Sequence, residues 1–199
     1  MYDNTLIIFT SDHGDMMGDH NMWRKTYAYE GSAAIPMIVK PPSTVSAARP
    51  KGSVIDAPVE LRDVLPTMLD AAGIDVPADM DGASMLAVIK DADAPWRKYI
   101  DLEHATCYSD RNYWTALTDG HVKYIWFLRT GEEQLFDLDS DPTEAHNLAG
   151  VRKYSKQLAA MRQAMAAHLA ERGEEWVKDG QLQTRSSTML YSPHYNGGK

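Results

Sequence analysis

Apolar residues near the start of the chain form one continuous run that ends abruptly in polar residues. Residues 4–9 read Asn-Thr-Leu-Ile-Ile-Phe, which favours a buried parallel strand. A second strand is predicted at residues 36–40, and residues 41–52 form a loop rich in proline and small polar residues. Ligands in open α/β sheets sit beyond the carboxyl ends of the strands. We therefore expect a functional loop directly after the first strand.

Helical patterns follow further along the chain. A helix is predicted over residues 61–72, and Pro66 inside it should kink or restart it. A short helix is predicted over residues 85–90. The longest helix is predicted over residues 151–172, and its apolar stripe is typical of core packing: Leu158, Met161, Met165 and Leu169.

Strand patterns occupy the region between the last two helices. Asp119-Gly120 predicts a tight hairpin turn between the second and third of four strands. The four strands are expected around residues 99–103, 113–118, 123–128 and 134–138.

Charge and composition narrow the class of protein. The net charge is -8 over 199 residues and no Lys/Arg cluster occurs, which argues against a nucleic-acid partner. No apolar stretch approaches the roughly 18 residues of a membrane span, and no secretion signal is readable, so a cytoplasmic location is the default expectation. The single cysteine excludes an intrachain disulfide and leaves the redox compartment open.

Asp12 and His13 directly follow the first strand, and glycines come next at positions 14 and 18. A carboxylate oxygen suits Ca²⁺ or Mg²⁺, and an imidazole also suits Mn²⁺ or Zn²⁺. The alternative is that Ser11 and Asp12 simply cap a helix. The two residues taken alone leave both interpretations open.

An ordered series of motifs extends this pair. Lys25 follows His13 by 12 residues, and Tyr29-Glu30 and a proline-led strand come after it. Further motif segments are residues 63–74, 81–86, 123–125 and 133–144. In this order they resemble the sulfatase family of the alkaline phosphatase superfamily, with its S-D-H/N-G, D-x-x-P-T-x-L-x-x-A-G, D-G-x-S-L and K-Y-I…D-P-x-E motifs. Gly31 and Ala34 depart from the family's pattern, which puts local salt bridges in doubt.

The resemblance implies an α/β fold, namely the C-terminal part of an alkaline-phosphatase-like sulfatase. End strands of the large sheet would accompany a small antiparallel four-stranded sheet packed on a long helix. The expected divisions are the catalytic α/β part at residues 1–95, the small-sheet subdomain with its helix at 96–180, and an irregular tail at 181–199. The family's paired aspartates and its C/S-x-P-x-R motif, whose Cys or Ser becomes formylglycine, are expected in a missing N-terminal part.

Site roles also follow from the resemblance. Asp12 and His13 would share a divalent metal, with Ca²⁺ expected first and Mg²⁺ or Mn²⁺ as alternatives. Lys25 would place its ammonium against a sulfate oxygen, as a catalytic and substrate-binding residue. His20 and His104 are candidate substrate contacts, and His104 could help to select the organic part of the ester. The alternatives are an exposed lysine, a structural His20 and a solvated strand end at His104.

Cys107 and Arg111 share the spacing of the nucleophile motif, but Ser109 stands where that motif needs Pro or Ala. The segment also follows the metal pair instead of preceding it. Cys107 is therefore interpreted as a small structural residue.

Two classes of function remain. The first is a sulfuric ester hydrolase acting on a small sulfate ester or saccharide, inactive as this chain alone because the nucleophile is absent. Phosphonate or phosphate monoester hydrolysis is the runner-up within the superfamily. The second class is a non-catalytic remnant that acts only by association. In either case we expect self-association or pairing with a missing N-terminal half, since the apolar first strand would otherwise leave an open edge.

Overall fold

The computed structural model describes residues 1–107, 109 and 112–186. The chain divides into two compact units. Unit 1 comprises Met1–His13 and Ile35–Ile100, and unit 2 comprises Gly14–Ala34 and Asp101–Lys199. Among the described residues, no helix is both long and apolar enough to cross a membrane.

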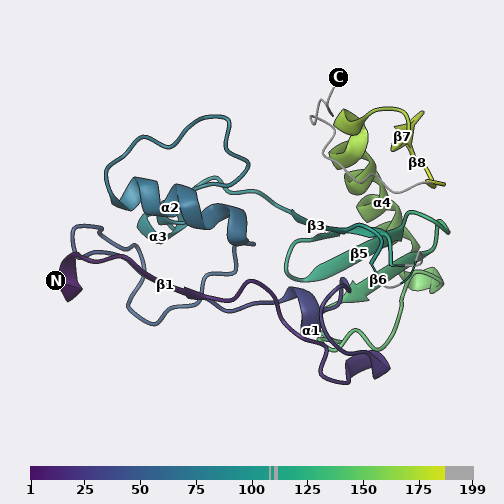
Figure 1. Ribbon diagram of the computed structural model, residues 1–199, viewed down its shortest axis with the longest axis horizontal. Helices are drawn as coiled ribbons and strands as arrows, with labels where there is room; N and C mark the ends of the chain where they lie inside the picture. The colour runs from purple at the N-terminus through teal and green to yellow at the C-terminus, as the bar shows by residue number, and fades with distance from the viewer. Residues whose placement is uncertain (108, 110–111, 187–199) are drawn as a thin grey trace. The chain divides into compact units, whose positions relative to one another are not determined.

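Unit 1 contains a two-stranded antiparallel ribbon. Strand β1 (Ile7–Thr10; Figure 1) pairs with β2 (Met37–Lys40). Phe9 is the register partner of Ile38. This pairing differs from the buried parallel strand expected from the apolar run. In the described chain β1 pairs only with this antiparallel strand, and Phe9 and Ile38 remain 62% and 61% exposed.

Two motif segments of unit 1 meet around a buried carboxylate. The 3₁₀-helix η3 (Leu61–Asp63) runs into α2 (Val64–Ala71), and α3 (Leu86–Lys90) follows. Asp63 is fully buried and accepts hydrogen bonds from the amides of Glu60 and Ala83 at 2.9 Å each, while Arg97 neutralises its charge. Pro66 does restart the helix, because α2 begins two residues before it and the first turn does not need the missing N–H.

Unit 2 is built on a four-stranded antiparallel sheet in the order β3-β4-β5-β6. The strands are β3 (Ile100–His104), β4 (Trp114–Thr118), β5 (Val122–Phe127) and β6 (Glu133–Asp137). The Asp119-Gly120 turn forms as predicted, with Gly120 at φ +89°. All four strands lie within one or two residues of their predicted positions.

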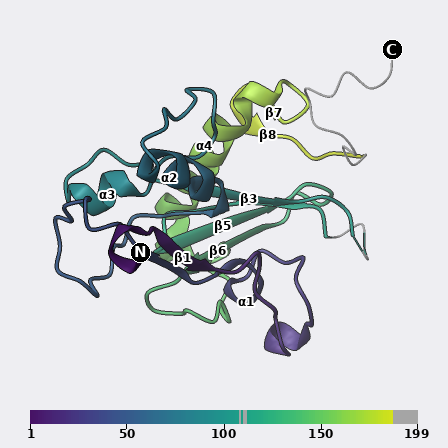
Figure 2. The same cartoon turned by 60° about the vertical axis from the view of Figure 1, so that its left-hand side comes forward.

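A long helix covers one face of this sheet. Helix α4 (Ser155–Leu169) is flanked by the 3₁₀ turns η4 (Arg152–Tyr154) and η5 (Ala170–Arg172), and it lies beside the sheet at an angle to the strands in both ribbon views (Figures 1 and 2). The predicted apolar stripe is the buried face of the helix. Thr115 is the second residue of β4, and its hydroxyl oxygen lies 3.7 Å from the sulfur of Met165 in this helix.

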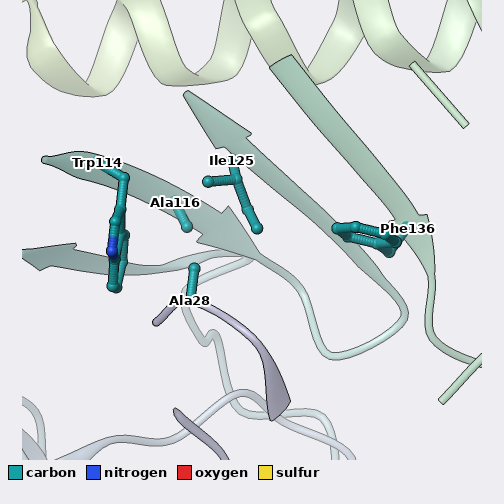
Figure 3. Packing of buried hydrophobic residues seen from close by; sticks show 5 residues of the cluster. All are labelled: Ala28, Trp114, Ala116, Ile125 and Phe136. Atoms are coloured by element: carbon teal, nitrogen blue, oxygen red, sulfur yellow. The ribbon is translucent and has the colours of Figure 1, made fainter. Parts of the chain in front are cut away.

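The other face of the sheet packs against the segment around Ala28. Side chains alternate along a strand, so Trp114 and Ala116 point away from α4, and Ile125 lies opposite Ala116. Figure 3 shows these residues and Phe136 gathered around Ala28, which is 4% exposed. The segment before α1 (Glu30–Ala33) is thereby fixed to the sheet.

The chain after α4 forms a small hairpin of β7 (Val177–Lys178) and β8 (Gln181–Leu182). The first residues of the segment expected to be an irregular tail are therefore paired. Residues 187–199 of that segment lie outside the described part of the chain.

Candidate functional site

Asp12 and His13 lie just beyond the end of β1, as the sequence predicts. The His13 Nε2 atom is 3.4 Å from Asp12 Oδ2, and the two side chains are 38% and 80% exposed respectively. Both side chains are therefore accessible to solvent. Among the described residues, no group of three or more His, Cys, Asp or Glu side chains could hold a metal ion.

The following loop has an unusual backbone. Residues with positive φ recur through it, and none of the following is glycine: Met17, His20, Asn21, Arg24 and Thr26. The Asp15 carboxylate holds the loop by accepting hydrogen bonds from the amides of Met17 (2.9 Å) and Arg24 (3.1 Å). Strained conformations of this kind concentrate at functional sites.

Lys25 lies in this loop, between two residues of positive φ, and its side chain is exposed. The residues on both sides of Lys25 thus have an unusual backbone conformation, while its own side chain is exposed to solvent.

His20 belongs to the short 3₁₀-helix η2 (Asp19–Asn21) and stacks on Tyr29, with ring centroids 4.1 Å apart and an angle of 6° between the planes. Its Nε2 donates to the Thr143 carbonyl oxygen at 2.9 Å, since a carbonyl can only accept. Tyr29 donates from its hydroxyl to Gln134 at 3.0 Å, and burial raises the pKa of that phenol. His20 is thus built into the packing of unit 2.

His104 ends β3 and is held in a similar way. Its Nδ1 donates to the Asn112 carbonyl oxygen at 2.9 Å, and its ring stacks on Trp114 at 5.8 Å. Because Nδ1 carries a proton, Nε2 is the nitrogen that can accept one from a ligand. Trp114 in turn donates to the Thr26 carbonyl oxygen at 2.9 Å.

A pocket of about 200 Å³ lies within unit 2, against these aromatic residues. Its wall includes Tyr27, Ala28, Tyr29, Trp114, Ile125 and Phe127. Cys107 also lines it and is half-buried, whereas Arg111, its partner in the apparent nucleophile motif, lies outside the described residues.

A buried ionic cluster fixes the segment that carries Tyr29. Lys123 is fully buried, and its Nζ lies 2.6 Å from Glu30 Oε1, 2.8 Å from Glu144 Oε1 and 2.8 Å from the Ala28 carbonyl oxygen. Glu144 Oε2 accepts a hydrogen bond from the amide of Glu30 at 2.5 Å. Burial raises the pKa of Glu144, against the opposing effect of Lys123.

Comparison with known proteins identifies this arrangement. Residues 18–171 match the family model described as N-sulphoglucosamine sulphohydrolase, C-terminal. The chain belongs to the sulfatase family. The mixed α/β fold with its four-stranded sheet and long helix is that of sulfatase C-terminal regions.

Individual sulfatases match over most of this chain. An arylsulfatase of Clostridium perfringens is 40% identical over 178 residues, which covers 89% of this chain and 36% of the relative. An N-acetylglucosamine-6-O-sulfatase of Bacteroides thetaiotaomicron is 29% identical over 194 residues, covering 94% and 33%. A solved structure in complex with its substrate D-glucosamine-2-N,6-O-disulfate superimposes with a TM-score of 0.73 at 29% identity, covering 85% and 35%. This sulfatase chain thus spans about a third of the length of the curated relatives it matches.

The structure brings together some of the sulfatase motif residues and leaves others in separate units. Asp12 and His13 are adjacent in unit 1, whereas Lys25, His20 and His104 belong to unit 2. Sequence reasoning missed the buried cluster of Lys123, Glu30 and Glu144. All three residues lie in the family's motifs, so the sequence marks each of them, but nothing in their spacing shows that their side chains meet.

Proposed function

We propose that this chain is the C-terminal portion of a metal-dependent sulfuric ester hydrolase. The observation that carries the proposal is an exposed Asp-His pair at the end of β1 in a chain of the sulfatase family. The nucleophile and the remaining metal ligands would then come from outside these residues. This proposal is supported by the coverage, because the chain spans only about a third of the length of its relatives.

Asp12 and His13 carry donor atoms of the type that binds a divalent cation, but two ligands are too few to complete its coordination. A hard carboxylate oxygen and an imidazole nitrogen are suitable donors, whereas Ca²⁺ takes six to eight oxygen ligands. When bound, the metal would act as a Lewis acid that neutralises charge on the sulfuryl oxygens. We infer that Asp12 and His13 supply two of its ligands.

Lys25 would bind the sulfate group through its ammonium. The exposed side chain on a strained loop favours contact with an anion over a role in packing. In the transition state, charge builds on the sulfate oxygens and on the leaving oxygen, so a fixed ammonium lowers the barrier. His104 would face the organic part of the ester through Nε2, because Nδ1 is used by Asn112.

Metal binding can be tested on this chain directly by calorimetric titration with Ca²⁺, Mg²⁺ and Mn²⁺. Two protein ligands predict weak binding, and Asp12→Ala should weaken it by about tenfold, or about 1.4 kcal/mol. Asp79→Ala, another exposed aspartate in unit 1, is the matched control and should bind like the wild type. Equal binding by Asp12→Ala and the wild type would refute the assignment.

Hydrolysis is tested with 4-nitrophenyl sulfate and metal. The chain alone should give no sustained turnover, and joining it in frame to a segment carrying the C/S-x-P-x-R motif should restore activity that Lys25→Ala then lowers. Preference for a 4-nitrophenyl phosphonate ester would favour the runner-up activity. Turnover by the chain alone that Cys107→Ala abolishes would show that the nucleophile is Cys107 after all.

We also propose that the β1–β2 ribbon associates with another chain segment. Phe9 and Ile38 in this ribbon are more than half exposed. Burial of such apolar surface against another segment is favourable. Light scattering at several concentrations should show association, which the double variant Phe9→Ser/Ile38→Ser reduces. A monomer at all concentrations would contradict this.

A further inference from the structure

The main chain beside Lys25 is attached to the sheet of unit 2 at Thr26, the residue that follows it. The Thr26 carbonyl oxygen accepts a hydrogen bond from Trp114 Nε1 at 2.9 Å, although 88 positions separate the two residues. The amide of Thr26 donates to Ser32 Oγ at 3.3 Å. Thr26 has a φ of +135°, which is rare for a β-branched residue and persists only where the surrounding structure holds it. These two hydrogen bonds provide such a hold.

Trp114 is a firm anchor for this segment. It is the first residue of β4 and is only 5% exposed. Figure 3 shows its ring pointing from the strand to the side of the sheet on which Ala28 lies. A close-packed ring of this size has little freedom to move. The carbonyl of Thr26 is therefore bonded to a rigid part of unit 2.

The same indole also contacts His104. Its N–H is shared with a second acceptor, Asn112 Oδ1, at 3.0 Å. The main-chain oxygen of Asn112 accepts from His104 Nδ1 at 2.9 Å, and the His104 ring stacks on Trp114 with 5.8 Å between the centroids. Two candidate substrate residues from distant segments, Lys25 and His104, are thus anchored to one side chain.

We propose that Trp114 is a positioning residue for Lys25 and acts through the carbonyl of Thr26. The inference rests on the proposed function, in which Lys25 binds the sulfate group. A side chain stabilises an anion from a restricted set of positions, and the main chain from which it extends sets that range. Loss of the indole N–H would release Thr26 from its unusual conformation and displace the origin of the Lys25 side chain.

One substitution and a matched control isolate the indole N–H. Trp114→Phe removes this donor and keeps an aromatic ring. Trp126→Phe makes the same change on the neighbouring strand β5, at a residue that is 9% exposed and whose Nε1 has no hydrogen-bond partner among the described residues. A chain with 3-benzothienylalanine in place of Trp114 exchanges the N–H for sulfur at nearly constant shape. It tests the same hydrogen bond if Trp114→Phe does not fold.

Amide hydrogen exchange, followed by NMR, reports on the segment around Lys25. The amide of Thr26 donates to Ser32, and the amide of Met16 donates to the Arg24 carbonyl oxygen at 3.0 Å, so these two bonds flank Lys25. We expect removal of the indole N–H to raise both exchange rates about tenfold and Trp126→Phe to leave them unchanged.

The amides of α4 serve as the internal reference and should keep their wild-type exchange rates in every variant. An equal increase in α4 would mean that the whole unit is destabilised, and it would overturn the proposal. Exchange near Lys25 that is the same after loss of the Trp114 N–H as in Trp126→Phe would overturn it as well.

Inorganic sulfate tests whether the effect reaches Lys25 itself. Binding to the chain is followed through the amide shifts of residues 16–26. Lys25→Ala and Trp114→Phe should each weaken binding by about threefold or more, whereas Trp114→Phe should have no further effect once Lys25 is alanine. A residue that acts through Lys25 has nothing left to position in that background. Two independent factors that multiply would indicate a merely structural role and refute the proposal.

Failure of this inference is distinguishable from failure of the proposed function. Absence of sulfate binding by the wild-type chain would refute the role of Lys25 in the proposed function, and the exchange rates would still decide whether Trp114 holds the segment. Sulfate binding that depends on Lys25 but is unchanged in Trp114→Phe would support the proposed function and refute the positioning role.

Discussion

Replacing Lys123 by methionine should destabilise unit 2 in a strongly pH-dependent way. The ammonium is fully buried and faces Glu144, which is itself 2% exposed, so the variant leaves a buried carboxylate without its countercharge. The folded chain can avoid this only by protonating Glu144. Its Oε2 can still accept the hydrogen bond from the Glu30 amide when the carboxyl is neutral.

The magnitude follows from this protonation. At pH 7, about 2.5 units above the ordinary glutamate pKa of 4.5, it costs about 3.4 kcal/mol at about 1.36 kcal/mol per unit. The Ala28 carbonyl also loses its hydrogen bond from Lys123, which adds about 1 kcal/mol. We therefore expect a loss of about 4 kcal/mol at pH 7, within the roughly 3–5 kcal/mol typical of broken buried pairs.

The sign of the pH dependence is opposite to that of an ordinary paired carboxylate. In the variant the pKa of Glu144 is raised further in the folded state, so stability is retained below pH 4.5 and is lost as the pH rises. At pH 5 the protonation cost is only about 0.7 kcal/mol, which brings the total loss to about 2 kcal/mol.

Urea unfolding at pH 5 and pH 7 measures this, followed by tryptophan fluorescence, to which Trp114 and Trp126 in the same sheet contribute. Lys90→Met, which breaks an exposed pair in unit 1, is the control and should cost less than about 1 kcal/mol. The double variant Lys123→Met/Glu144→Gln should lose the pH dependence. An equal loss for Lys123→Met at both pH values would refute the reasoning.

Two further predictions concern stability. Burial raises the pKa of Glu133, but the hydrogen bonds from Arg162, at 2.6 Å to each carboxylate oxygen, contribute to a net pKa below the ordinary 4.5. The stabilisation from this carboxylate is therefore present above pH 4.5 and is lost as the pH falls through the lower pKa of the folded state. Glu133→Gln should accordingly make acid unfolding, followed by circular dichroism, less dependent on pH. A Cβ on Gly82 would lie 1.9 Å from the Arg62 carbonyl oxygen, so Gly82→Ala should cost about 1–3 kcal/mol in urea unfolding, whereas Gly150→Ala, with open space around it, should not; equal effects would contradict this.

Local elements were largely predictable because short-range rules decide them. The Asp119-Gly120 turn and the alternating strands around it follow from turn chemistry and a period of two residues, and the structure has them within one or two residues of the prediction. The buried stripe of α4 follows from helical periodicity in the same way. Asp12 and His13 are consecutive in the sequence, so their proximity does not depend on the tertiary structure.

Contacts between distant segments were decided by the tertiary structure. Lys123 meets Glu30 and Glu144 only because the sheet brings three separate motifs together, and no spacing in the sequence encodes that meeting. The pairing of β1 is a similar case, because an apolar run favours a strand but does not specify its neighbour or its direction. The sequence alone thus determined the family, the local elements and the candidate chemical groups, since these depend on residue type and short spacing. The pocket, the orientation of His104 and the buried charges depend on packing between segments, and only the folded chain could show them.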